Sequence, residues 1–194
     1  MTESVRDIIM SRRTIRRFKQ IPVDRSILQD VLEAGRLAPS AANLQPLEFV
    51  LVDDREVVRR IFPCLSWAAY VAPRRNPLPG QEPIAYIVTL VHLGIREKGF
   101  EYDVGAAMEN MILAARGAGL GTCWLLSIDR EKIGGILGVP STRRIDCVLA
   151  LGYPAESPVA EEMTDSLKYW LDAEGVLHVP KRALRSICHF NRFG

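Results

Sequence analysis

The sequence predicts an α+β protein, built as a single domain over residues 1–194. Short runs of β-branched and aliphatic residues have the length of buried strands, and longer segments between them carry apolar residues at helical spacing. No internal repeat and no linker divides the chain, and its length is sufficient to bury one core. We therefore expect a sheet that is flanked by helices.

In the N-terminal half, Asp24 is expected to cap a helix that Pro39 ends. A loop of small and amide side chains then runs from Pro39 to Pro46. The elements expected in this half are a helix at 4–10, a helix at 24–37, a strand at 49–52 and a short helix at 55–61.

In the C-terminal half, the proline-rich segment at 73–83 indicates a long surface loop, which either serves binding or is disordered. The segment at 102–118 has the longest helical pattern and is apolar nearly all round, so it is either a core helix or part of a subunit interface. The other elements expected here are strands at 84–91, 122–126 and 145–151, a helix at 129–137 capped by Asp129, an edge or exchanged strand at 176–180, and a short helix through His189.

The overall charge argues against nucleic-acid binding. The chain holds 25 Lys and Arg against 23 Asp and Glu, which leaves a net charge of +2. A general nucleic-acid binder usually has a strong basic excess, so we expect no nucleic-acid partner. The charge is uneven, however, because residues 179–194 contain several basic side chains and no acid. Both ends of the chain are basic and could converge on one anion.

The cysteines form neither a disulfide framework nor a metal site in this prediction. Cys64, Cys123, Cys147 and Cys188 are widely spaced, with no C-x-x-C pair, so we expect reduced thiols. The sequence opens with no signal-peptide pattern and contains no apolar run of about 18 residues, the length that could span a membrane. We expect a cytoplasmic protein with no membrane and no metal partner.

Residues 11–18, which we call the arginine segment, have the sequence SRRTIRRF. If this segment is extended, Arg12, Thr14 and Arg16 share one face while Ile15 points into the core. Guanidinium groups pair bidentately with phosphate oxygens and keep their charge at any physiological pH. The segment therefore predicts an anion site, and a merely solvated basic segment is the alternative.

No catalytic constellation stands out elsewhere. His92, His178 and His189 are scattered, and the chain has neither a P-loop nor a dinucleotide-binding glycine fingerprint after a strand. Paired carboxylates and nucleophile motifs are also missing. An arginine segment with small-residue loops and no catalytic side chain indicates a protein whose chemistry belongs to a bound cofactor.

Five motifs give this hypothesis a specific form. After the arginine segment the chain carries APSAANLQP at 38–46, GAGLGTCW at 117–124, LGYP at 151–154 and VPKR at 179–182. In this order they resemble the nitroreductase family of flavoproteins, over nearly the whole chain. The resemblance implies a central mixed, largely antiparallel sheet of four or five strands. It also implies FMN bound non-covalently at the interface of an intertwined homodimer, whose C-terminal strand joins the partner's sheet.

Carried over residue by residue, the resemblance implies roles for single side chains. Arg12 and Arg13 fall where the family binds the FMN phosphate and ribityl chain, Thr14 keeps a hydroxyl where serine is commoner, and Arg16 approaches the pyrimidine edge. The implied FMN-binding residues are Arg12, Arg13, Thr14, Arg16, Pro39, Ser40, Ala41, Asn43, Leu126, Ser127, Lys181 and Arg182.

The remaining members of this set follow from the later motifs. The loop from Pro39 to Asn43 lies along the isoalloxazine ring in the family, and the backbone of Leu126 and Ser127 lies beside the flavin N5 edge. Lys181 and Arg182 match the basic pair that closes on the phosphate.

The implied function is reduction of a small organic acceptor, of nitroaromatic or quinone type, by NAD(P)H. Hydride would pass through flavin N5 with ping-pong kinetics and without a catalytic side chain. The alternatives are a specialised member, such as a reductive dehalogenase or a flavin-consuming enzyme, and a flavin-binding or storage module without turnover. Leu47 departs from the family, which usually has tryptophan there, and Trp67 and Tyr70 are candidates for aromatic walls of the substrate pocket.

Overall fold

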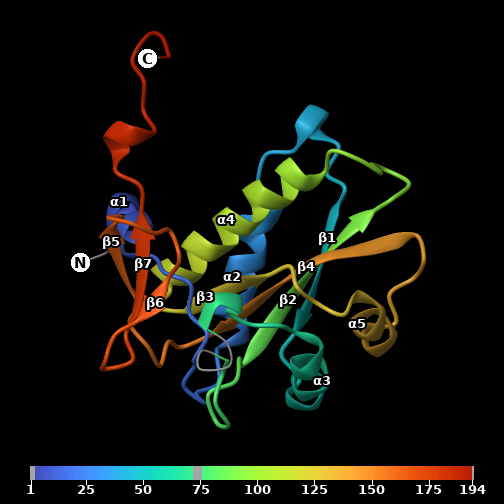
Figure 1. The fold of residues 1–194 in the computed structure, drawn as a ribbon. Helices are drawn as coiled ribbons and strands as arrows, with labels where there is room; N and C mark the ends of the chain where they lie inside the picture. The colour runs from blue at the N-terminus through green and yellow to red at the C-terminus, as the bar shows by residue number, and fades with distance from the viewer. Residues whose placement is uncertain (1–2, 72–75, 194) are drawn as a thin grey trace.

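Helices cover both faces of a central antiparallel sheet in the computed structural model, which describes residues 3–71 and 76–193 (Figure 1). The helices are α1 (Val5–Ser11), α2 (Arg25–Arg36), α3 (Arg55–Ile61), α4 (Glu101–Gly117) and α5 (Arg130–Leu137). The strands are β1 (Leu47–Val52), β2 (Ala85–His92), β3 (Gly121–Leu125), β4 (Arg143–Gly152), β5 (Val159–Glu162), β6 (Trp170–Leu171) and β7 (Leu177–Lys181).

The central sheet has the strand order β1-β2-β4-β3, and every neighbouring pair is antiparallel. Its two inner strands, β2 and β4, are buried on both faces, which explains why their sequences are almost continuous apolar runs. The prediction of a largely antiparallel sheet of four or five strands is confirmed. β1 and β3 form the two edges.

One face of the sheet packs against α2 and α4. Ile87 and Leu149 are fully buried there beside Met108 and Met111 of α4. Gly35 of α2 lets the two helices come close, because a Cβ at this position would lie 2.8 Å from Met111 Cγ. The core-helix interpretation of residues 102–118 is therefore confirmed.

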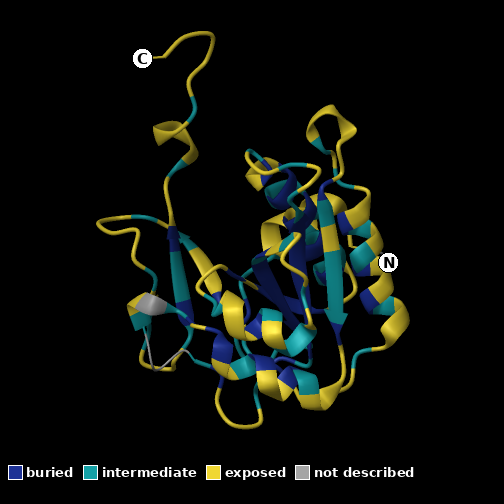
Figure 2. Cartoon of the chain, turned by 90° about the vertical axis from the view of Figure 1, so that its right-hand side faces the viewer, coloured by how far each residue is buried: buried dark blue, intermediate teal, exposed yellow. Residues whose placement is uncertain are grey.

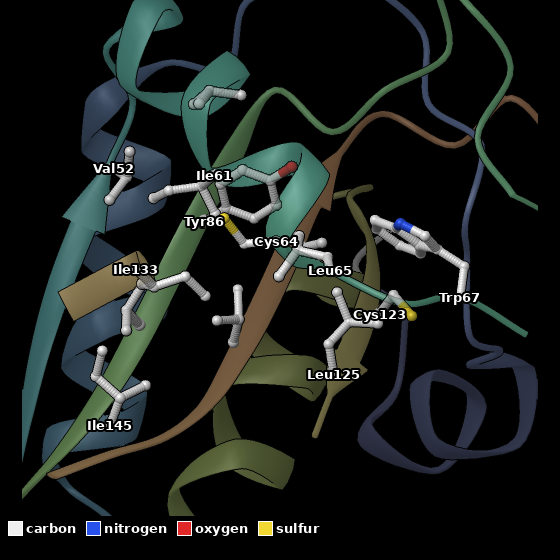
Figure 3. Packing of buried hydrophobic residues seen from close by; sticks show 14 of the residues in the cluster. Val52, Ile61, Cys64, Leu65, Trp67, Tyr86, Cys123, Leu125, Ile133 and Ile145 are labelled. Carbon is white, nitrogen blue, oxygen red and sulfur yellow. The ribbon is translucent and has the colours of Figure 1, made fainter. Parts of the chain in front are cut away.

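The other face packs against α3 and α5. Ile61 and Ile133, from these two helices, meet Tyr86 and Ile145 of the sheet (Figure 3). A bulge between Thr89 and Leu90 in the pairing of β2 with β4 places Ile145 on this face and Cys147 on the opposite one.

Polar side chains set the helix starts as the sequence predicts. Asp24 accepts a hydrogen bond from the Ser26 N–H at 2.8 Å, and Asp129 accepts one from the Lys132 N–H at 3.1 Å. Such caps satisfy backbone donors that have no partner inside the helix.

The C-terminal part differs from the prediction. β7 pairs with β5 on one side and β6 on the other, so it is the central strand of a three-stranded sheet rather than an edge strand. We call β5, β6 and β7 the C-terminal sheet. The expected helix through His189 is wrong, since only the 3₁₀ turn Leu184–Ser186 forms. The chain beyond this turn is largely exposed and leads away from the body (Figures 1 and 2).

His178 connects all three strands of the C-terminal sheet. Its Nδ1 lies 2.8 Å from Glu161 Oε2 on β5, and its Nε2 lies 3.2 Å from Asp172 Oδ2, just after β6. The ring also stacks on Trp170 with a centroid distance of 4.3 Å, and the indole N–H donates to Glu161. The hydrogen bond to Glu161 is the main cause that raises the pKa of His178 above its ordinary value of 6.5.

This pairing predicts a titration that site-specific NMR can follow. Protonated His178 stabilises the C-terminal sheet fully below pH 6.5, and this contribution is lost as the pH rises through the raised pKa. Glu161→Gln should lower the pKa of His178 more than Asp172→Asn does. Glu162→Gln, the control on the same strand, should leave it unchanged. A pKa of His178 at or below 6.5 in the wild type would contradict the geometry.

Gly121 provides a test of how the arginine segment packs. A Cβ at Gly121 would lie 2.7 Å from Ile15 Cγ1 and 2.8 Å from Ile15 Cβ, and the branched side chain has little room to move. Gly121→Ala should lower the free energy of unfolding in urea by about 1–3 kcal/mol. Gly105→Ala is the control, because, apart from its chain neighbours and the nearby backbone of its own helix, no described atom lies within 4 Å of the added methyl group. Equal stability of the two variants would contradict this packing.

Candidate functional site

The arginine segment lies along the free edge of β3. Thr14 forms a parallel bridge with Thr122, and the Ile15 N–H donates to the Thr122 carbonyl at 2.8 Å. Ile15 is buried and Thr14 is half-buried, which confirms the extended conformation with Ile15 in the core.

A second set of hydrogen bonds holds the segment from the chain after β4. The Arg16 N–H donates to Glu156 Oε1 at 2.6 Å, and the Ala155 N–H donates to the Arg17 carbonyl at 2.9 Å. The segment thus behaves as an added strand whose backbone is fixed on both sides. Its arginine side chains are consequently presented from a rigid support.

Arg13 Nη1 donates to the Met10 and Arg12 carbonyls at 2.9 and 2.6 Å, but part of the hydrogen-bonding capacity of these arginines is unused within the described chain. Arg12 approaches Glu109 only at 4.0 Å, and the Arg16 guanidinium lies 5.7 Å from the centre of the Tyr169 ring. Among the described residues, neither Arg13 Nε nor Arg16 Nε has an acceptor, although both atoms are buried. Burial and the adjacent Arg12 charge lower the pKa of Arg13. A cluster of this kind favours an anion that brings several acceptor oxygens.

A cavity of about 330 Å³ lies beside the segment. Arg12 and Arg13 line it together with Arg116, which sequence reasoning missed. Arg116 donates to Ser11 Oγ and to Glu3 Oε1, both at 2.9 Å. In the sequence it is indistinguishable from the ordinary basic residue in the last turn of a helix.

The predicted pair Leu126 and Ser127 follows β3 directly and is exposed. Their carbonyls are engaged, because the Ser66 N–H donates to Ser127 at 3.0 Å and Arg130 Nη2 donates to Leu126 at 3.3 Å. Within the described chain, the N–H groups of Leu126 and Ser127 donate no hydrogen bond. Two exposed backbone donors are therefore available at the end of β3.

The loop at 39–46 has an unusual backbone. Ala42, Asn43 and Gln45 have φ angles of 53°, 54° and 50°, the left-handed region that side chains other than glycine rarely adopt. Ser40 Oγ donates to Asp103 Oδ2 at 3.0 Å, and the Ala41 N–H donates to Asp103 Oδ1 at 3.1 Å. Asp103 was not among the predicted site residues.

One chain does not bring all the predicted residues together. Arg12, Arg13, Thr14, Arg16, Leu126 and Ser127 lie along β3, whereas Pro39, Ser40, Ala41 and Asn43 precede β1 at the opposite edge. Four strand spacings of about 4.8 Å separate β1 from the arginine segment, roughly 19 Å in all. Lys181 and Arg182, at the end of β7, form no hydrogen bond or ion pair with the described arginine segment, and Arg182 donates to the Ser186 carbonyl instead.

The two candidate aromatic walls, Trp67 and Tyr70, lie in different environments. Trp67 is 7% exposed and lies in the core cluster (Figure 3), with its ring centroid 6.0 Å from that of Phe62, so it is not an exposed wall. Tyr70 is exposed and packs on Tyr169 with a centroid distance of 5.0 Å. Leu47 lines a small cavity of about 120 Å³ beside the loop at 39–46. Of the expected loop at 73–83, residues 73–75 lie outside the described chain.

Cysteines and potential metal ligands among the described residues form no further site. The four cysteines are free thiols, and burial raises the pKa of Cys123 to about 11 and that of Cys147 to about 12. In residues 3–71 and 76–193, no three His, Cys, Asp or Glu side chains are placed to hold a metal ion. None of the helices in these ranges is long and apolar enough to cross a membrane.

Solved structures and sequence relatives agree with this fold. An FMN-dependent nitroreductase from Clostridium difficile superposes with a TM-score of 0.69 at 25% identity, over 96% of this chain and 98% of its own. A protein named NADH dehydrogenase from Thermus thermophilus is 32% identical over 174 residues, which cover 76% of this chain and 85% of the relative.

A second relative has a more specialised name. The 5,6-dimethylbenzimidazole synthase of Rhodospirillum rubrum is 30% identical over 179 residues, which cover 77% of this chain and 82% of the relative. The sequence model described as the nitroreductase family matches residues 9–153, most of the chain. This chain therefore belongs to the nitroreductase family.

Proposed function

We propose that this protein is an FMN-dependent oxidoreductase, which takes electrons from NAD(P)H and delivers them to a small nitroaromatic or quinone-type acceptor. The observation that carries this proposal is the donor set along β3. Among the described residues, the buried Nε atoms of Arg13 and Arg16 have no acceptor and lie along this strand, and two unused backbone donors lie at its end. This set suits a ligand that combines a phosphate with a polar aromatic ring.

Arg12 and Arg13 would hold the phosphate. A phosphomonoester carries nearly two negative charges, and several charged donors are needed to bury it. The two guanidinium groups are adjacent, and the nearest acid to Arg12 is 4.0 Å away, so an anion would relieve their mutual repulsion. Thr14 adds a hydroxyl on the same face of the segment, and Lys181 and Arg182 would close on the phosphate after the tail moves.

Arg16, Leu126 and Ser127 would hold the ring. FMN, when bound, supplies hydride transfer at its ring nitrogen N5. The backbone donors of Leu126 and Ser127 would orient the N5 edge of the ring, and Arg16 would stabilise negative charge at its pyrimidine edge. We propose that NAD(P)H and the acceptor use the same side of the ring in turn, which gives ping-pong kinetics without a catalytic side chain.

We further propose that the site is shared between two copies of the chain. The loop at 39–46 lies too far from the arginine segment to line the same ring within one chain, so it would serve the partner's FMN. The separation is also visible along α4, where Asp103 holds the loop and Arg116 holds Ser11. These two residues are roughly 20 Å apart on an α-helix.

Exposed apolar side chains support a homodimer. Such residues occur on α1, at the start of α4 and along the C-terminal tail, where water would otherwise solvate them: Val5, Ile9, Met10, Tyr102, Leu184, Ile187, Phe190 and Phe193. Intertwined interfaces commonly bury more than about 2,000 Å². We propose that the tail exchanges between subunits and covers these faces.

A flavin-consuming enzyme is the second candidate function, because a dimethylbenzimidazole synthase is among the relatives. The fate of FMN during turnover distinguishes these candidates from one another and from a storage module. The proposed enzyme returns FMN unchanged after many cycles, whereas a flavin-consuming enzyme loses it, and a storage module does not react with NAD(P)H.

The role of Arg16 predicts a kinetic effect. Purified protein should bind FMN, and anaerobic NAD(P)H should bleach its yellow colour within a stopped-flow experiment. Arg16→Gln should slow this bleaching by about tenfold or more, since a charged group worth about 1.5–3 kcal/mol is lost. Lys19→Gln is the control, because Lys19 is an exposed cation beside the segment.

Steady-state kinetics complete this test. Double-reciprocal plots at several acceptor concentrations should be parallel, with FMN recovered intact. Protein that takes up no FMN would end the proposal. Intersecting lines would contradict the single-side arrangement, and FMN loss in step with turnover would favour the flavin-consuming alternative.

A further inference from the structure

Asp103 is a buried acid in the first turn of α4, with 4% of its side chain exposed. A buried carboxylate is costly unless hydrogen bonds and a counter-charge compensate for the lost water. Here both oxygens accept hydrogen bonds from the loop at 39–46, one from Ser40 Oγ at 3.0 Å and one from the Ala41 N–H at 3.1 Å.

The hydrogen bonds continue from Asp103 through Ser40 to the far end of the loop. Ser40 Oγ donates its proton to Asp103 and accepts the Gln45 N–H at 3.0 Å. The carboxylate thereby fixes the direction of the Ser40 hydroxyl, which in turn fixes Gln45. Two of the left-handed residues, Ala42 and Asn43, lie between the anchored Ala41 and Gln45, and Gln45 is itself left-handed.

The counter-charge is Arg96. Its Nη1 lies 3.5 Å from Asp103 Oδ2, while its Nε donates to the Lys98 carbonyl at 3.0 Å. An asparagine at position 103 would offer one acceptor where the loop and Arg96 need two. The site therefore requires a carboxylate and not only a polar group of the same shape.

We infer that Asp103 is the positioning residue of the loop at 39–46, and so determines how the loop meets the ring of an FMN bound by the partner subunit. This inference rests on the proposed function. Asp103 touches neither FMN nor substrate in this scheme. It acts by anchoring Ser40 and Ala41, which lie directly before the left-handed residues Ala42 and Asn43.

The test combines substitutions at both ends of the first hydrogen bond. Asp103→Asn and Ser40→Ala should each weaken FMN binding by about tenfold or more, measured by fluorescence titration of flavin-depleted protein. The double variant should lose less binding than the sum of the two single losses, because both changes disrupt the hydrogen bond between Ser40 and Asp103. Ser40→Thr keeps the hydroxyl and should restore binding. Glu101→Gln, an exposed acid in the same helical turn, should bind FMN as the wild type does.

Amide hydrogen exchange gives a readout that does not depend on FMN. The Ala41 and Gln45 amides should lose protection in Asp103→Asn and Ser40→Ala, and keep it in Glu101→Gln. If Asp103→Asn does not fold, the comparison of Ser40→Ala with Ser40→Thr still decides the matter.

The outcomes separate the two proposals. Wild-type protein that binds no FMN would overturn the proposed function and this inference together. Wild-type protein that binds FMN, with unchanged affinity in Ser40→Ala and Asp103→Asn, would overturn the inference alone. Independent, additive losses in the double variant would also overturn it.

Discussion

The width of the central sheet is the constraint on which the rest of this structure depends. β2 and β4 are buried on both faces, so the segments that can contact a ligand lie at the two outer edges. The arginine segment extends one edge beyond β3, and the loop at 39–46 precedes β1 at the other. Under the proposed function, each edge would present half of a flavin site.

Different physical interactions hold the two halves. The arginine segment depends on close apolar packing, because Ile15 fits against the bare backbone of Gly121, and the Ile15 N–H donates to the Thr122 carbonyl of β3. The loop depends on a buried charge, since Asp103 binds Ser40 and Ala41, which lie directly before the left-handed Ala42 and Asn43. α4 links the two, with Asp103 near its start and Arg116 near its end. A rigid helix thus keeps the halves at a constant separation, which a symmetric dimer can match.

The sequence predicted the features that depend on local pattern. The continuous apolar runs of β2 and β4 indicate strands that are buried on both faces, and Asp24 and Asp129 mark helix starts through their capping oxygens. The alternation within the arginine segment correctly places Ile15 in the core. The family resemblance then supplied candidate residues at both edges of the sheet.

The sequence did not predict features that depend on contacts between segments far apart in the chain. β5 and β6 are short, and β5 is mostly exposed, so neither has a strand pattern. In the sequence, Asp103 is indistinguishable from an ordinary acid at a helix N-terminus. Only the tertiary structure shows that the loop at 39–46 binds it. The same holds for Trp67, whose burial depends on α3 and the segment after it.

Complementation between two defective variants tests the shared site most directly. Arg12→Glu damages the half beside β3, and Ala41→Glu damages the exposed loop. Each variant alone should bind little FMN. After subunit exchange, half of the dimers are hybrids with one intact site, so about a quarter of all sites should recover. A site contained within one chain would give no recovery, and that result would contradict the account.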